Sequence, residues 1–124
     1  MIIGVYLSSI HQGYSCQTWP LCPNGFGFPP DEYFYEHFHR FLGLILALSL
    51  FSFTAFSVVK VRNRNLSIKL TIASTLLASQ IILGWAVIAT KLQPIVVASH
   101  LSTGIALFGM LVVTLISLHH EMKS

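Results

Sequence analysis

Three long runs of apolar residues dominate the sequence, and short polar segments separate them. The runs are Phe41–Val59, Leu70–Thr90 and Ile95–Leu118. None of them contains Asp, Glu, Lys or Arg, and each is close to the roughly 20 residues that a helix needs to cross a bilayer. The pattern therefore predicts three transmembrane helices.

The N-terminal stretch Met1–Ile10 is also apolar, but it has only about half the length of a span. It lacks the basic residues that open a signal peptide. We interpret it as a first transmembrane helix that is either short or lacks an upstream piece. The predicted fold class is an all-α integral membrane protein, a single four-helix transmembrane bundle over residues 1–124. Its helices are expected at about 1–11, 33–60, 67–90 and 95–119, with an outer loop at 12–32.

The composition agrees with this class. Of the 124 residues, 54% are hydrophobic and only 9% are charged, and the mean hydropathy is +0.73. A soluble domain carries about 25% charged residues, so this chain lacks the charge to cover a water-facing surface. The net charge of +3 does not indicate nucleic-acid binding, because the basic residues gather mostly in one short loop.

The positions of the basic residues predict the orientation in the membrane. Four of the seven lie in the segment Lys60–Lys69, and Lys123 follows the third apolar run. Two crossings separate these sites, so they share a side, which the positive-inside rule makes cytoplasmic. We therefore expect a multi-pass protein of the plasma membrane, with the 60–69 loop and the C-terminus in the cytoplasm and the 12–32 loop outside.

Both cysteines of the chain, Cys16 and Cys22, lie in the expected outer loop, within the stretch SCQTWPLC. Disulfides persist in oxidising space outside the cytoplasm, and Pro20 favours the tight turn that so short a bridge needs. Two interpretations remain open: a bridge that holds the loop, or a redox-active pair, since exposed or strained bridges are the labile ones. A zinc site is not favoured, because four Cys or His ligands are usual and only His11 lies nearby.

The polar cluster EHFHR, Glu36–Arg40, opens the first long helix. At helical spacing Glu36, His39 and Arg40 fall on one side, at positions i, i+3 and i+4, whereas His37 points nearly opposite His39. The cluster therefore offers a carboxylate, an imidazole and a guanidinium to a common site.

His100 lies inside an apolar span, where an ionisable residue indicates a functional site by default. It follows Ile95 by five residues, which places it about 7 Å below the outer end at about 1.5 Å per residue. His39 follows Tyr33, the expected start of its helix, by six residues. Both histidines thus reach a similar depth, and we expect them to face each other.

A glycine accompanies each of these histidines. Gly43 follows His39 by four residues, and Gly104 follows His100 by four. Each glycine lies one turn deeper on the face of its histidine, where a missing side chain lets a flat group approach the backbone. Two neutral imidazoles over small residues suit the axial ligation of haem iron. For the glycines alone, ordinary packing of small residues is the alternative.

Other polar residues in the spans have simpler explanations. Gln80 and Gly84, also four residues apart, offer a polar contact and a close approach, but helix packing accounts for them as well. His119 and His120 lie at the cytoplasmic end of the third span, where a helix C-terminus and the membrane interface favour them.

The segments GYSCQTWPLC, EHFHR and LGWAVIATKLQPIVVASHLSTG occur in this order, and together they resemble the haem A synthase family over essentially the whole chain. Members typically have two four-helix halves, each with a histidine pair. The resemblance implies a half-length member, similar to the substrate-binding half and working as a homodimer. It also implies that His39 and His100 ligate haem iron, that Glu36 lies near the oxidised ring methyl, and that Cys16 and Cys22 are the loop pair.

The reaction implied by the resemblance converts a methyl group of haem O into a formyl group by successive hydroxylations, giving haem A for terminal oxidases. Haem O would be the substrate, and haem b a further cofactor. Glu36 would relay protons or orient a hydroxylated intermediate, while Arg40 would support Glu36 or pair with a haem propionate. The implied partners are haem O and haem A, the lipid bilayer, a second copy of the chain, and haem O synthase or terminal-oxidase assembly proteins.

Two other functions compete with this one. A non-catalytic, bis-histidine haem-binding protein for electron transfer needs only the two ligands and gives Glu36 no role. A membrane thiol oxidoreductase that uses Cys16 and Cys22 with a quinone leaves His100, inside the membrane, without an explanation.

Overall fold

The computed structural model describes Ile2 and residues 34–124. Residues 34–124 form three long helices and no strand. They are α2 at Phe34–Phe56, continued by the π-helical turn η2 at Ser57–Val61, then α3 at Arg64–Ala89 and α4 at Pro94–Lys123. All three are long and apolar enough to cross a membrane. This confirms the three predicted spans and the all-helical class for the described part of the chain.

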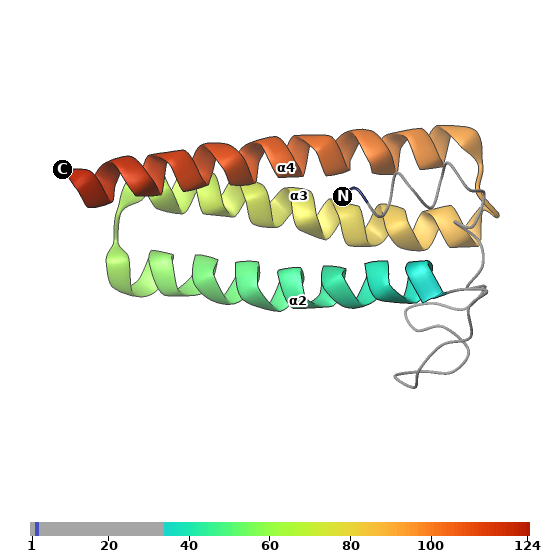
Figure 1. Ribbon diagram of the computed structural model, residues 1–124, viewed down its shortest axis with the longest axis horizontal. Helices are drawn as coiled ribbons and strands as arrows, with labels where there is room; N and C mark the ends of the chain where they lie inside the picture. Colours follow the sequence, from blue (N-terminus) through green and yellow to red (C-terminus); the bar gives the residue numbers. More distant parts are fainter. Residues whose placement is uncertain (1, 3–33) are drawn as a thin grey trace.

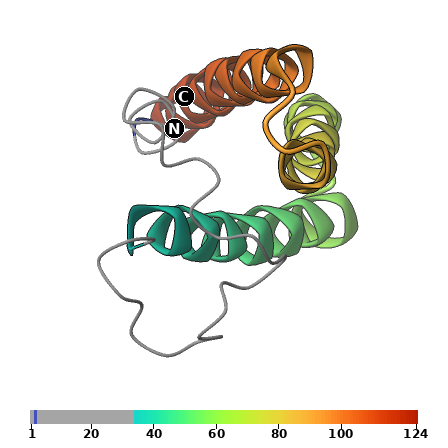
Figure 2. The same ribbon diagram turned by 90° about the vertical axis from the view of Figure 1, so that its right-hand side faces the viewer.

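The central helix of the three is α3, which lies between α2 and α4 (Figure 1). Successive helices run in opposite directions, so the start of α2 and the α3–α4 turn lie at one end. The α2–α3 connection and the C-terminus lie at the other. Figure 2 shows that the helices form an open arc rather than a flat layer. α3 packs against both neighbours, and more extensively against α4 than against α2.

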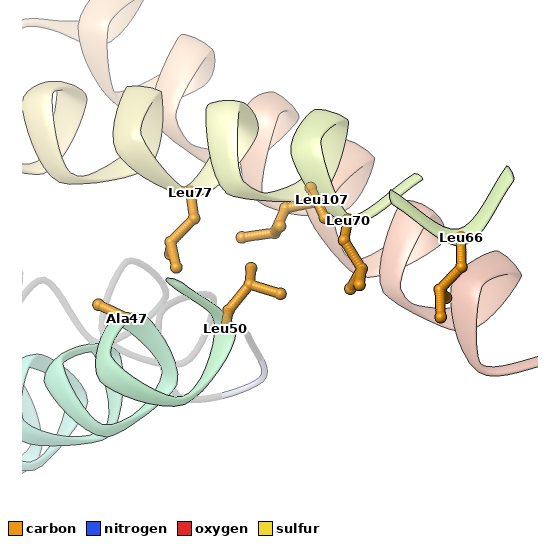
Figure 3. Packing of buried hydrophobic residues seen from close by; sticks show 7 residues of the cluster. Ala47, Leu50, Leu66, Leu70, Leu77 and Leu107 are labelled. Atoms are coloured by element: carbon orange, nitrogen blue, oxygen red, sulfur yellow. The ribbon is translucent and has the colours of Figure 1, made fainter. Parts of the chain in front are cut away.

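The apolar core follows one stripe of α3. Its buried residues Leu66, Leu70, Ala73 and Leu77 recur at the spacing of a single helix face. They meet Ala47 and Leu50 of α2 and Leu107 of α4 (Figure 3). Many apolar side chains on the outer faces remain exposed, as expected of helices that contact lipid.

A polar contact joins α2 to α3 within the spans. The hydroxyl of Thr54 donates to the backbone carbonyl of Leu50 at 2.7 Å, and its oxygen lies 2.8 Å from the Ser74 hydroxyl. Hydroxyl groups that bond across helices are a common means of association in membranes, where burial of apolar surface does not drive helices together.

The connection between α2 and α3 is shorter than the loop predicted at 60–69. η2 continues to Val61 and α3 begins at Arg64, so only two residues remain between them. Arg62 adopts a left-handed conformation with φ 56°. Asn63 caps α3 by accepting a hydrogen bond from the backbone N–H of Leu66 at 3.2 Å. An asparagine cap stabilises a helix start, and α3 therefore begins three residues earlier than predicted.

Two side-chain contacts tie the start of α3 to the end of α4. Asn63 Nδ2 donates to Glu121 Oε2 at 2.8 Å, and Lys69 Nζ donates to Ser117 Oγ at 2.5 Å. The end of α4 at Lys123 lies beyond the predicted end at 119, because the polar residues after the apolar run continue the helix.

A tight turn reverses the chain between α3 and α4. Lys91 and Leu92 both adopt left-handed conformations, with φ 53° and 65°, and Pro94 is the first residue of α4. Proline suits this position because the first turn of a helix needs no N–H donor there. Because α4 begins at this turn, the turn fixes how far each following residue of α4 lies from this end of the bundle.

Several predictions fall outside the described residues: the first helix at 1–11, the outer loop at 12–32, and the cysteines Cys16 and Cys22. They remain predictions.

Leu107→Ala should destabilise the protein by about 2 kcal/mol or more, because it leaves a cavity where the three helices meet. Leu107 is 1% exposed, whereas Leu115 on the same helix is 66% exposed. Leu115→Ala is therefore the matched control and should leave stability almost unchanged. Equilibrium unfolding in detergent micelles measures both, and equal losses would contradict the packing described.

Candidate functional site

The two histidines paired on sequence lie at the same end of the helices. His39 is near the start of α2 and His100 near the start of α4, and both helices start at the end that carries the α3–α4 turn. Each side chain is partly buried, and the two imidazoles are close enough to interact electrostatically. The structure thus places His39 and His100 near each other at one end of the helices, although they are 61 positions apart in the sequence.

A buried ion pair stands beside His39. Arg40 Nη2 donates to Glu36 Oε1 at 2.6 Å, one turn apart on α2, and Glu36 is only 4% exposed. A carboxylate in apolar surroundings is costly unless it is paired, and the bond to Arg40 supplies a partner. Glu36, His39 and Arg40 therefore form the cluster that helical spacing predicted, and His37 lies on the same turn, partly exposed.

Below His100, α3 and α4 meet through two glycines. A Cβ atom at Gly84 would lie 3.5 Å from Cε1 of His100, and one at Gly104 would lie 2.7 Å from Nε2 of Gln80. Each polar side chain thus lies over the glycine of the opposite helix. Because the helices are antiparallel and both pairs are four residues apart, the two contacts fit the same register.

Two buried polar atoms in this contact have no hydrogen-bond partner among residues 34–124: Oε1 of Gln80 and Nδ1 of His100. The ring of His100 also lies close to the backbone of Gln80. Buried polar atoms are nearly always paired in proteins. An orphaned imidazole nitrogen next to a second histidine is therefore a candidate for binding an external group.

The glycines predicted to admit a flat group differ in their surroundings. Among the described residues, no atom lies within 4 Å of where a Cβ on Gly43 would be, whereas Gln80 fills the space beside Gly104. Gly43 thus leaves room beside α2. Gly104 serves the packing of α3 on α4, which was the alternative considered for these glycines.

The site residues fit a haem. Haem iron can be held by two imidazoles, and the structure offers one imidazole from each of two helices. The described residues leave open space beside Gly43. Across residues 34–124, no three His, Cys, Asp or Glu side chains gather as a metal site.

Sequence reasoning did not predict that Gln80 lies over Gly104 and His100 over Gly84. The signal was present in the equal four-residue spacing on two helices that run in opposite directions. To pair Gln80 with Gly104 from the sequence, one would need to know the register between the two helices. The spacing of residues within each helix does not give that register.

A family model described as "cytochrome oxidase assembly protein" (COX15-CtaA) matches residues 27–124 of the chain. No curated protein and no solved structure matches the chain. The matched range includes every described residue of the site.

Glu36 and Arg40 should be energetically coupled. In a double-mutant cycle with Glu36→Gln and Arg40→Met, we expect an interaction free energy of about 0.5–3 kcal/mol, because the two charged groups are in direct contact. Equilibrium unfolding of the two single variants and the double variant measures it. A cycle of Glu36→Gln with His37→Gln is the control and should be additive. Additivity in both cycles would contradict the pairing.

Proposed function

The chain belongs to the COX15-CtaA family of cytochrome oxidase assembly proteins, the haem A synthase family, and on that premise we propose that it oxidises a methyl group of haem O to a formyl group. The family implies a part in haem A biosynthesis or cytochrome oxidase assembly. The observation that carries the finer proposal is the approach of His39 to His100 next to the buried carboxylate of Glu36.

In this proposal His39 and His100 would hold the haem through its iron. They come from different helices, so they can approach a flat group from its two sides. Bound haem O is the substrate whose ring methyl is oxidised. Gly43 leaves the space beside α2 that a ring edge needs.

Glu36 and Arg40 act at the rim of the same site. The guanidinium fixes Glu36 through the 2.6 Å bond, which holds a carboxylate one turn before His39 where it can accept or return a proton. Arg40 has five N–H donors. It can therefore hold Glu36 and also bind a haem propionate, whose carboxylate matches the guanidinium fork.

The proposal also includes a fourth helix and a second copy of the chain. Residues 1–11 would add a fourth helix to the three described, making one four-helix domain of residues 1–124. Two copies would then form a homodimer in which a second site holds haem b for electron transfer. Haem O synthase and terminal-oxidase assembly proteins are the expected partners, because haem is too hydrophobic to travel free through water.

Membranes that contain this chain and a haem O source should accumulate haem A, and His39→Ala, His100→Ala and Glu36→Gln should each abolish the accumulation. Extraction of the haems and chromatography with mass detection measures this. The two histidine variants should also lose bound haem, whereas Glu36→Gln should keep it, because the carboxylate is not a ligand.

His37→Ala is the matched control for these variants, since it removes a histidine from the same turn of α2. It should retain both bound haem and product. Bound haem without any conversion in the parent chain would instead favour the electron-transfer function. Unchanged haem content in both His39→Ala and His100→Ala would overturn the ligand assignment.

We also propose that the site faces the outside of the plasma membrane. The basic residues of the α2–α3 connection and Lys123 lie at the end opposite His39 and His100, and positive charge marks the cytoplasmic side. The predicted Cys16–Cys22 loop would then lie in oxidising space, close to the site end of the bundle.

Single cysteines should report this orientation. In a background with Cys16→Ser and Cys22→Ser, Gln93→Cys should react with a membrane-impermeant maleimide in intact cells. Asn65→Cys should react only after the membrane is opened. Gel-shift detection of the labelled chain measures both, and the reverse pattern would overturn the orientation.

A further inference from the structure

Gln80 lies on α3 opposite the part of α4 that carries His100. We propose that Gln80 is the positioning residue of His100: its side chain, seated at Gly104, supplies the acceptor for the ring N–H of His100 when the other ring nitrogen binds haem iron. This inference rests on the proposed function, because it concerns how a haem ligand is held.

The first argument is the fit of Gln80 to α4. Gly104 is buried, and a Cβ there would lie 2.7 Å from Nε2 of Gln80, closer than such atoms can approach. The amide can keep this place only because residue 104 is glycine. The contact at Gly84 is looser, since a Cβ would meet His100 at an ordinary 3.5 Å.

The second argument is the chemistry of a ligating histidine. When one ring nitrogen binds a metal, the other carries the proton, and it almost always donates to a carboxylate, carbonyl or water. Nδ1 of His100 and Oε1 of Gln80 are both buried, and neither has a partner within the described residues. The ring also lies close to the Gln80 backbone, so the two residues are neighbours. One hydrogen bond to the amide oxygen would satisfy both atoms, each of which is costly to leave unpaired.

The third argument is that neighbouring hydroxyls are already engaged. Ser79 donates to the Thr75 carbonyl at 3.0 Å, and Ser99 donates to the Ile95 carbonyl at 2.8 Å. Each of these bonds stays within its own helix. Gln80, by contrast, reaches across to α4 and presents an oxygen that no described residue uses.

The test uses the full chain, purified in detergent with its bound haem. Gln80→Met removes the acceptor at similar side-chain length. It should raise the haem reduction potential and speed haem dissociation by roughly 10- to 100-fold, the usual cost of losing a partner of a metal ligand. The potential rises because an imidazole without an acceptor donates less electron density and stabilises ferric iron less.

Gln80→Glu keeps an acceptor oxygen, so its reduction potential should stay at or below that of the parent chain. Ser79→Ala is the matched control on the neighbouring residue and should change neither the potential nor the dissociation rate. Redox titration and transfer of haem to apomyoglobin measure these two quantities without any turnover. A Glu variant that behaves like the Met variant would overturn the inference.

Gly104→Ala separates the proposed role of Gln80 from a direct contact of haem with Gly104. The added methyl group should displace Gln80 and reproduce the effect of Gln80→Met, while Gly84→Ala should resemble the parent. In a Gln80→Ala background, Gly104→Ala should have no further effect. A full effect in that background would mean that haem itself packs on Gly104, which would overturn the inference.

The outcomes also separate this inference from the proposed function. If the parent chain binds haem through His39 and His100 but the potential is the same in Gln80→Met, the positioning role is wrong and the haem site stands. If the parent chain binds no haem, the proposed function and the inference both fail.

Discussion

The contact of α3 with α4 at Gly84 and Gly104 determines where His100 lies, and the rest of the site is arranged around it. Lipid is as apolar as the helix surfaces, so the helices are held together by close packing and polar contacts rather than by burial from water. Glycine allows this close packing at two places. Gly84 lies against the ring of His100, and Gly104 lies against the amide of Gln80. Because both pairs share a four-residue spacing, a shift of either helix by one turn would break both contacts together.

Polar contacts at the two ends of the bundle serve different purposes. At one end, Asn63 and Lys69 of the α2–α3 side bond to Glu121 and Ser117 and close the start of α3 onto the end of α4. At the other end, Glu36 and Arg40 are paired within α2. The first end is thus fastened between helices. The charged pair at the second end lies on α2, the helix that also carries His39.

The sequence alone predicted what depends on composition and on spacing within a helix. It identified three spans and the family, and it placed Glu36, His39 and Arg40 on one side of α2. It misplaced the start of α3, because the polar residues after Asn63 look like a loop until the asparagine is seen to cap a helix. It also could not predict that Gln80 lies over Gly104, since this depends on the register between two helices.

The unequal packing of α3 has a consequence for how haem would enter and leave. Among the described residues, α3 packs more extensively against α4 than against α2, so we expect α2 to separate from α3 more readily than α4 does. We expect loading and release to proceed by movement of α2, which carries His39, Glu36 and Arg40 away together. His100 would keep its place on α4 against α3 throughout, so one ligand would stay in position while α2 moves.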